Sequence, residues 1–198
     1  MKDAYRLLAP FYSQISRWVF GENRKEANRY FLEKLPFDKV LMIGGGDGSD
    51  YQFLNKKLSG DYWERSQSML ALASRNLKET SLDFHLGHFS GNGKYDLICL
   101  PFVLDSFKDE ELEVFLKKIT VNLKENGRLV FSDFFPPVGF RQKVVHGLMI
   151  GFHRLFAAYR REEIPEYSRF FEKAGWQLLE EKSWKEGWIK VQVYELAD

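Results

Sequence analysis

The feature that most constrains the fold of this chain is a regular alternation of short apolar runs with helical stretches. Five of the runs read as strands: Lys39–Ile43, Asp61–Glu64, Leu82–Leu86, Tyr95–Leu100 and Arg128–Phe134. Between them, apolar residues at helical spacing predict a helix ending near Leu58 and helices over Ser66–Leu77 and Asp109–Leu123. Strands that alternate with helices form a parallel sheet with helices on both faces, so the pattern predicts an α/β fold.

The two flanks of this region extend the pattern without a linker. Ala4–Phe20, interrupted near Pro10, and Glu22–Leu35 read as helices and predict an N-terminal helical cap over residues 1–36. After the fifth run, residues 137–160 carry apolar side chains at helical spacing and predict a helical lid. No stretch rich in Pro, Gly or Ser divides the chain, so we expect a single domain over residues 1–198.

The end of the chain predicts strands of a different kind. A helix over Glu163–Ala174 stops at Gly175, and the runs Trp176–Trp184 and Trp188–Leu196 flank a three-residue turn. Such a pair reads as a β-hairpin. We therefore expect a Rossmann-like, seven-stranded sheet that is mostly parallel and ends in an antiparallel hairpin.

Composition excludes several classes of protein. The 29 basic residues nearly balance the 28 acidic ones, which argues against a nucleic-acid-binding protein. The single cysteine, Cys99, lies in an apolar run and is expected to be a small buried side chain. Met1–Arg6 leads into no signal-peptide core, and no uncharged apolar run has the roughly 20 residues of a membrane helix. We expect a cytoplasmic protein without membrane insertion, acting as a monomer or homodimer.

Glycines at alternate positions follow the first predicted strand. Gly44, Gly46 and Gly48 allow the backbone to approach a ligand closely, and the next helix offers unpaired N–H groups at its start. Residue 49 is serine, whereas the dinucleotide motif G-x-G-x-x-G requires glycine there. The loop is either a ligand cradle or a tight structural turn.

Glu64 lies at a position where a carboxylate can bind a ribose. Glu64 ends the second predicted strand, and a carboxylate there can accept hydrogen bonds from both ribose hydroxyls of an adenosine cofactor or of NAD. An exposed acid at a strand end is common, but together with the glycine loop Glu64 predicts a nucleoside site.

Four segments resemble those of class I S-adenosylmethionine (SAM) methyltransferases. Glu64–Leu70 is similar to their acid-x-Ser-x-x-Met-Leu signature, Lys94–Ile98 to their fourth strand, and Leu123–Leu129 to the entry into their fifth. Tyr5–Tyr12, with Phe20-Gly21, resembles the opening of the ubiquinone/menaquinone-type group. The resemblance implies the Rossmann-like fold, SAM as cofactor and methyl transfer as activity.

The resemblance also implies where the cofactor would lie. Gly44, Gly46 and Gly48 would cradle its methionine part, and Glu64 would hold the ribose. The remaining contacts are assigned to residues around the adenine and the sulfonium: Arg65, Met69, His88 and Phe89 at the adenine, Tyr12 covering the site, and Leu100 and Pro101 near the sulfonium.

Two positions depart from the family pattern. Met42 replaces an acid near the ammonium of SAM, and His88 replaces an aspartate that accepts from the adenine amine. Each such charge-assisted hydrogen bond contributes roughly 1.5–3 kcal/mol. Asp47 is the candidate substitute for the charge missing at Met42.

Methyl transfer from a sulfonium requires alignment and, for some acceptors, removal of a proton. No metal-ligand cluster or Ser-His-Asp pattern stands out. His146 and His153, seven residues apart on one helix face, and Asp133, at the end of the fifth strand, are the candidate bases, with Asp105 after the fourth strand as a further one. Alternatively, the apolar stripe of the lid packs on the sheet, and both histidines lie at the surface or are hydrogen-bonded.

The sequence thus predicts a SAM-dependent methyltransferase acting by in-line transfer on a small acceptor that is apolar, lipid-like or quinone-like. A peripheral membrane contact through the basic flank of the lid fits such an acceptor. Met42 and His88 motivate an alternative, a non-catalytic module that binds a protein partner. A nicotinamide-dependent oxidoreductase is disfavoured by the glycine spacing and the hairpin.

Overall fold

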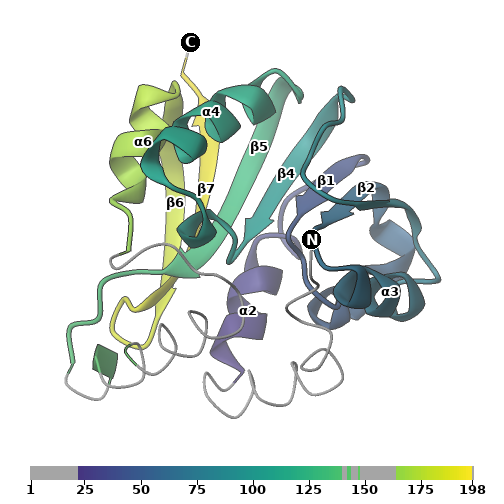
Figure 1. The fold of residues 1–198 in the computed structure, drawn as a ribbon, viewed down its shortest axis with the longest axis horizontal. Coiled ribbons are helices and arrows are strands. Elements are labelled where there is room, and N and C mark those ends of the chain that lie inside the picture. The colour runs from purple at the N-terminus through teal and green to yellow at the C-terminus, as the bar shows by residue number, and fades with distance from the viewer. Residues whose placement is uncertain (1–21, 140–141, 144–146, 148–163, 198) are drawn as a thin grey trace.

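The computed structural model describes residues 22–139, 142–143, 147 and 164–197. Its centre is a seven-stranded sheet in the order β3-β2-β1-β4-β5-β7-β6 (Figure 1). The strands are β1 (Val40–Ile43), β2 (Ser59–Glu64), β3 (Ser81–Leu86), β4 (Tyr95–Pro101), β5 (Leu123–Phe134), β6 (Trp176–Trp184) and β7 (Ile189–Leu196). The pairings among β1 to β5 are parallel, whereas β7 runs antiparallel to both β5 and β6. The predicted mixed sheet with a closing hairpin is confirmed.

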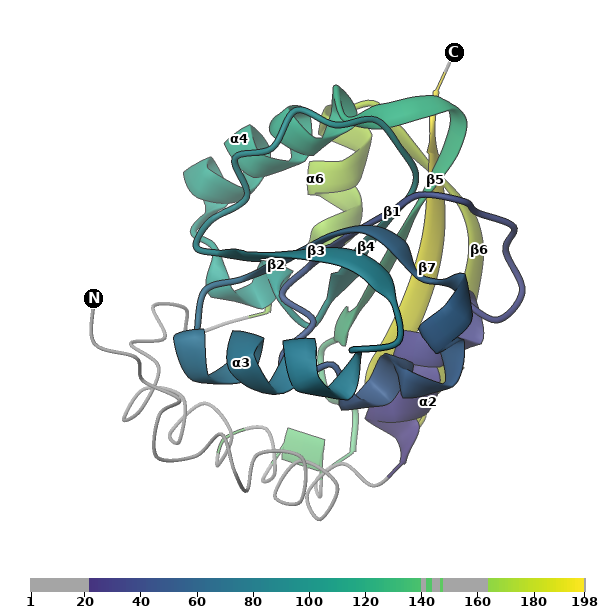
Figure 2. The same ribbon diagram turned by 90° about the vertical axis from the view of Figure 1, so that its right-hand side faces the viewer.

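Helices cover both faces of the sheet (Figure 2). One face carries α2 (Asn23–Tyr30), the 3-10 helix η1 (Ser49–Lys57) and α3 (Gln67–Asn76), and the other carries the short η2 (Leu104–Ser106), α4 (Asp109–Thr120) and α6 (Tyr167–Lys173). Residues 87–94 connect β3 to β4 without a helix.

Alternating side chains of the central strands fill two cores. In β1, Val40 and Met42 pack with the α2–η1–α3 layer, whereas Leu41 and Ile43 pack with the α4–α6 layer. Successive strand residues point to opposite faces, and helices cover both, so strands of this kind are apolar throughout. Cys99 is 3% exposed on the first face, as expected, and burial raises the pKa of its thiol.

Several elements differ from the predictions in their bounds or type; α6, for example, begins at Tyr167 and not at Glu163. β5 begins at Leu123 instead of Arg128, because residues 126–127 form an irregularity inside the strand: Asn126 has a φ of 60°, and the register against β4 shifts there. The helix after the glycine loop is a 3-10 helix. α2 ends at Tyr30, five residues before the predicted end.

Most of the N-terminal cap and of the lid lies outside the described residues. Of the cap, the structure describes residues 22–36, with α2, and of the lid only residues 137–139, 142–143 and 147. α2 packs against β7, β6 and η1.

Candidate functional site

The loop after β1 keeps its backbone accessible at the carboxyl edge of the sheet. Gly44, Gly46 and Gly48 have positive φ angles, and the Gly44 N–H donates over 2.8 Å to the carbonyl of Trp63 near the end of β2. A Cβ at Gly46 would meet nothing within 4 Å, whereas a Cβ at Gly48 would lie 2.9 Å from Cδ1 of Leu77. Gly46 therefore borders open space that a ligand can fill, and Gly48 allows η1 to pack against α3.

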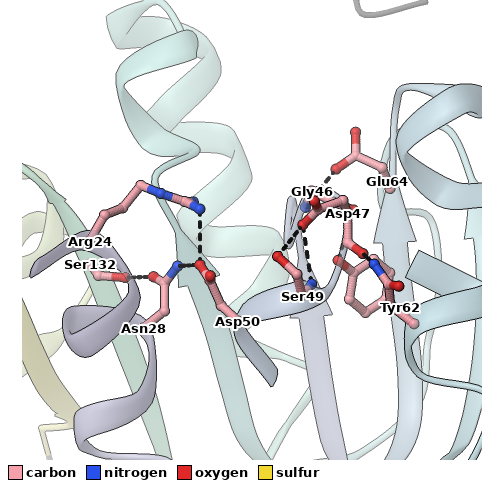
Figure 3. A network of polar contacts seen from close by, with 10 residues as sticks. Arg24, Asn28, Gly46, Asp47, Ser49, Asp50, Tyr62, Glu64 and Ser132 are labelled. Atoms are coloured by element: carbon pink, nitrogen blue, oxygen red, sulfur yellow. Dashed lines mark hydrogen bonds and ion pairs between the residues drawn. The ribbon is translucent and has the colours of Figure 1, made fainter. Parts of the chain in front are cut away.

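Glu64, the last residue of β2, lies directly beside this loop (Figure 3). Its Oε2 accepts from the Gly46 N–H over 3.1 Å, and its Oε1 accepts from the Ser66 N–H over 2.9 Å. Burial raises the pKa of Glu64, while the N–H groups of Ser66, Gly46 and Arg65 oppose that shift. Each carboxylate oxygen can accept two hydrogen bonds, so the group retains capacity for two ribose hydroxyls.

Side chains from three elements fix the middle of the loop. The Oδ1 of Asp47 accepts from the N–H and the hydroxyl of Ser49, over 3.1 and 2.8 Å. The Asp47 carbonyl accepts from Nδ2 of Asn76 over 2.8 Å, and the Tyr62 hydroxyl donates to the Gly46 carbonyl over 3.0 Å. Asp47 is only 8% exposed, so its negative charge is held close to the loop.

The residues after β3 form the part of the site assigned to the adenine. Phe89 is buried against Trp63, whose ring it meets edge to face at 5.6 Å, and its carbonyl accepts from Nζ of Lys118 over 2.6 Å. His88 is exposed; partial burial and the positive charge of Arg65 lower its pKa. A neutral imidazole has one nitrogen that accepts a hydrogen bond, so His88 can replace a carboxylate opposite an amine.

The end of β4 turns sharply beside the glycine loop. Phe102 follows Pro101 with a φ of 50°, and its N–H donates to the Ser132 carbonyl over 2.7 Å. A Cβ at Gly44 would lie 2.8 Å from Cγ2 of Val103, so this turn packs on the loop. Leu100 is fully buried in the α4–α6 core, and only its backbone can border a ligand.

A buried polar network joins α2 to η1 and β5 (Figure 3). Nη2 of Arg24 pairs with Oδ2 of Asp50 at 3.1 Å, and Nδ2 of Asn28 donates to the same oxygen over 2.9 Å. The hydroxyl of Ser132 donates to Oδ1 of Asn28 over 2.8 Å. The Arg24 guanidinium lies 6.0 Å from the ring centre of Phe102, so the network reaches the turn after β4.

The remaining predicted site residues lie in different surroundings, and some fall outside the described part of the chain. Tyr12, His146 and His153 lie outside the described residues. Met69 is buried in α3, and Arg65 is exposed at its N-terminal side. Asp133 is fully buried and has no surface to offer an acceptor, so any part that it takes in proton transfer passes through a neighbouring group.

Three residues of the site were missed by sequence reasoning. The alternation of β2 places Tyr62 on the face opposite Trp63, which was a usable signal for its contact with the loop. Asn28 and Asp50 gave no such signal, because their partners lie 22 and 104 residues away along the chain.

The residues present suit a cationic nucleoside ligand. Gly46 borders open space, Glu64 offers acceptors, and Asp47 brings negative charge to the loop. No group of three His, Cys, Asp or Glu side chains among the described residues is arranged to hold a metal ion. In the described ranges, every helix is too short or too polar to span a bilayer.

Comparisons with known proteins agree with this geometry. The family model of the methyltransferase domain matches residues 15–181. DhpI in its complex with SAH has a similar fold, with a TM-score of 0.72 and 15% identity over 98% of this chain and 93% of that chain. A SAM-dependent methyltransferase from Clostridium acetobutylicum ATCC 824 gives a TM-score of 0.68 and 14% identity over 94% of this chain and 98% of its own.

The mitomycin 7-O-methyltransferase MmcR gives a TM-score of 0.70 and 17% identity over 99% of this chain and 61% of its own. At these identities, the structural likenesses show the fold alone. No curated protein sequence matches this chain.

Proposed function

We propose that this chain, which belongs to the methyltransferase domain family, transfers a methyl group from SAM to a small, apolar, lipid-like or quinone-like acceptor. That it is a SAM-dependent methyltransferase follows from its family and fold. The single observation that carries the assignment of the site is the contact of Glu64 with Gly46, because it brings the ribose acceptor and the glycine loop together.

The residues that would hold the cofactor follow from the site. Gly46 provides open space for the methionine part, Glu64 accepts from the ribose, and His88 with Phe89 borders the adenine. Asp47 supplies the negative charge that Met42 does not, since Met42 is fully buried and carries none. When bound, SAM supplies a sulfonium-activated methyl group.

The protein's contribution to such a reaction is mainly alignment. A methyl transfer is an in-line displacement, so the acceptor must be held on the far side of the methyl group. The turn at Phe102 and Val103 packs on the glycine loop and lies where an acceptor would approach. The buried network of Arg24, Asn28 and Asp50 holds α2 next to this turn.

Aromatic side chains near this turn support an apolar acceptor. The ring of Phe102 packs at 4.9 Å from Phe134, which in turn packs at 5.4 Å from Trp188. Phe102 is only partly buried, so the aromatic group reaches the surface beside the site. Among proteins with this fold, the mitomycin 7-O-methyltransferase acts, by its name, on a small molecule.

Calorimetric titration with S-adenosylhomocysteine (SAH) tests the cofactor site. We expect micromolar binding to the wild type and at least about tenfold weaker binding to Glu64→Ala, which corresponds to roughly 1.4 kcal/mol. Glu79→Ala, at an exposed acid after α3, is the matched control and should bind like the wild type.

Incubation with methyl-labelled SAM and an apolar cell extract then tests the acceptor class, and label should move into the organic phase. A folded wild type that binds no SAH would contradict the enzyme assignment and favour the non-catalytic partner-binding alternative. Saturable binding of NADH would instead favour an oxidoreductase.

A further inference from the structure

The connection from β3 to β4, residues 87–94, lies in the part of the site assigned to the adenine and contains no helix. Three of its eight residues are glycine. A backbone of this composition has many accessible conformations, so contacts with other elements must fix its path. Two residues make such contacts from the other side of the sheet region: Lys118, in the last turn of α4, and Asn122, just beyond that helix.

The two ends of the connection are fixed by the core and by the sheet. Asn122 is 2% exposed, and its Nδ2 donates to the Gly93 carbonyl over 2.9 Å. At the other end, the Gly87 N–H donates to the carbonyl of Glu64, the last residue of β2, over 2.9 Å. Phe89 lies between these two attachments, in the middle of the connection.

Lys118 holds the connection at Phe89. Its Nζ donates to the Phe89 carbonyl over 2.6 Å and lies 5.6 Å from the centre of the Phe89 ring. A charged donor makes a stronger hydrogen bond than a neutral one, and an ammonium beside an aromatic ring is attracted to it. The ring is 5% exposed, and a Cβ at Gly91 would lie 3.0 Å from its Cε2. Lys118 therefore fixes both the backbone and the ring of Phe89.

The same contact places His88, because His88 directly precedes Phe89. Partial burial lowers the pKa of His88, the positive charges of Arg65 and Lys118 lower it further, and the negative charge of Glu111 opposes the shift. A neutral imidazole has a nitrogen that accepts a hydrogen bond from an amine. Lys118 thus favours the position of His88 and also its uncharged form.

We propose that Lys118 is a positioning residue for the adenine end of the cofactor: by holding Phe89, it places His88 to accept a hydrogen bond from the 6-amino group. This inference rests on the proposed function. Lys118 acts through Phe89 and His88, and its contribution is to binding and not to the transfer of the methyl group. A connection that is held in place before the ligand arrives loses less conformational entropy on binding, which strengthens the affinity.

The contact between Lys118 and Phe89 is tested without ligand by ¹⁵N relaxation of the backbone. We expect order parameters of about 0.85 for Phe89 and Gly91 in the wild type, and below about 0.6 in Lys118→Met, which removes the ammonium but keeps a long apolar side chain. Lys117→Met, at the exposed neighbouring position on α4, is the matched control. It removes the same charge and should keep the order parameters of the wild type.

The effect on the adenine is tested by calorimetric titration with SAH and with an analogue of SAH that lacks the 6-amino group, at about pH 8, where the imidazole is uncharged. Lys118→Met should bind SAH about tenfold more weakly than the wild type. Loss of the 6-amino group should weaken binding at least about tenfold in the wild type but less than about threefold in Lys118→Met. Lys118→Arg keeps a charged donor and should restore part of both effects, and Lys117→Met should behave like the wild type.

A residue that only stabilised the fold would weaken the binding of both ligands by the same factor. Equal weakening in Lys118→Met, or order parameters that this variant leaves unchanged, would therefore overturn the proposal. A folded wild type that binds no SAH would instead overturn the proposed function, and the relaxation measurement would still decide whether Lys118 holds the connection.

Discussion

Both carboxylate oxygens of Glu64 already accept hydrogen bonds from the backbone, one from Gly46 and one from Ser66. Because burial raises the pKa of Glu64, the folded, ligand-free protein binds this proton more tightly than the unfolded chain does. The contribution of Glu64 to the free energy of unfolding is therefore largest below the unfolded pKa of about 4.3 and falls as pH rises towards the folded value.

A ligand that donates to Glu64 favours its charged form. Ribose hydroxyls are such donors, so we expect the affinity for SAH to increase as pH rises through the folded pKa of Glu64, by up to about tenfold per pH unit. Titration calorimetry from about pH 4.3, the unfolded value, upward measures this slope. Glu64→Gln cannot ionise and should give a weaker but flat profile. An equal slope in that variant would assign the pH dependence to another group.

Two glycines of the same sheet region should respond to substitution to different degrees. A Cβ at Gly46 would enter open space, whereas a Cβ at Gly60, in β2, would collide with the carbonyl oxygen of Val40. Both have positive φ, which costs a residue with a side chain roughly 1–2 kcal/mol. Gly46→Ala should fold with about that loss and bind SAH at least tenfold more weakly, while Gly60→Ala should lose most of its folded population. Circular dichroism and calorimetry separate the two results.

At this scale, residues whose role depends on a local pattern could be predicted from the sequence. Glu64 was placed by its position at a strand end after a glycine loop, and the structure puts it in contact with that loop. The lowered pKa of the His88 imidazole could not be predicted, because it depends on burial and on the positive charges of Arg65 and Lys118.

At the level of elements, α2 is held to the sheet by a network that no local pattern reveals. Asn28 is 3% exposed and donates to Asp50 while accepting from Ser132, so one amide joins α2, η1 and β5. Asn28→Ala removes both bonds and leaves Asp50 with less compensation. We expect a loss of about 2–3 kcal/mol in the free energy of unfolding, measured with urea.

The matched control for Asn28→Ala is Lys78→Ala, which removes an exposed ion pair with Glu79 at 4.0 Å. It should change the stability by no more than about 0.5 kcal/mol. A loss below about 1 kcal/mol in Asn28→Ala would mean that α2 is held mainly by its apolar contacts with β6 and β7.

Elements whose apolar residues follow a clear helical or strand period could be predicted from the sequence. The clearest example is α4, in which one face is buried: Leu112, Phe115, Leu116 and Ile119. Element boundaries that depend on hydrogen bonding between strands could not be predicted. The start of β5 was placed at Arg128 because Asn126-Gly127 reads as a turn, but the backbone continues the ladder across it, with Leu123 paired to Tyr95. Residues that favour a turn look the same in the sequence whether they precede a strand or interrupt one. Only the pairing with the neighbouring strand distinguishes the two cases.

For the whole molecule, alternation of strands and helices predicted the sheet and both helical layers, since that order leaves few ways to bury two faces. The site could be predicted as far as the carboxyl edge of the sheet and the glycine loop. Asp133 could be named from the sequence only as an acid at a strand end, because its complete burial depends on packing from distant parts of the chain.

Because the proposed cofactor site draws on β1, β2, β3 and β4, a bound ligand should stabilise the whole fold and not one segment. A ligand that binds only the folded state at about 100 times its dissociation constant adds roughly 2.7 kcal/mol. For a domain of this size, each kcal/mol raises the melting temperature by about 2–4 °C. We therefore expect saturating SAH to raise the melting temperature of the wild type by about 5–10 °C in a single cooperative transition.

Gly46→Ala and Glu64→Ala should show at most a small part of this shift at the same SAH concentration, whereas Glu79→Ala should show all of it. A shift confined to one of two transitions would mean that the glycine loop unfolds independently of the hairpin end of the sheet.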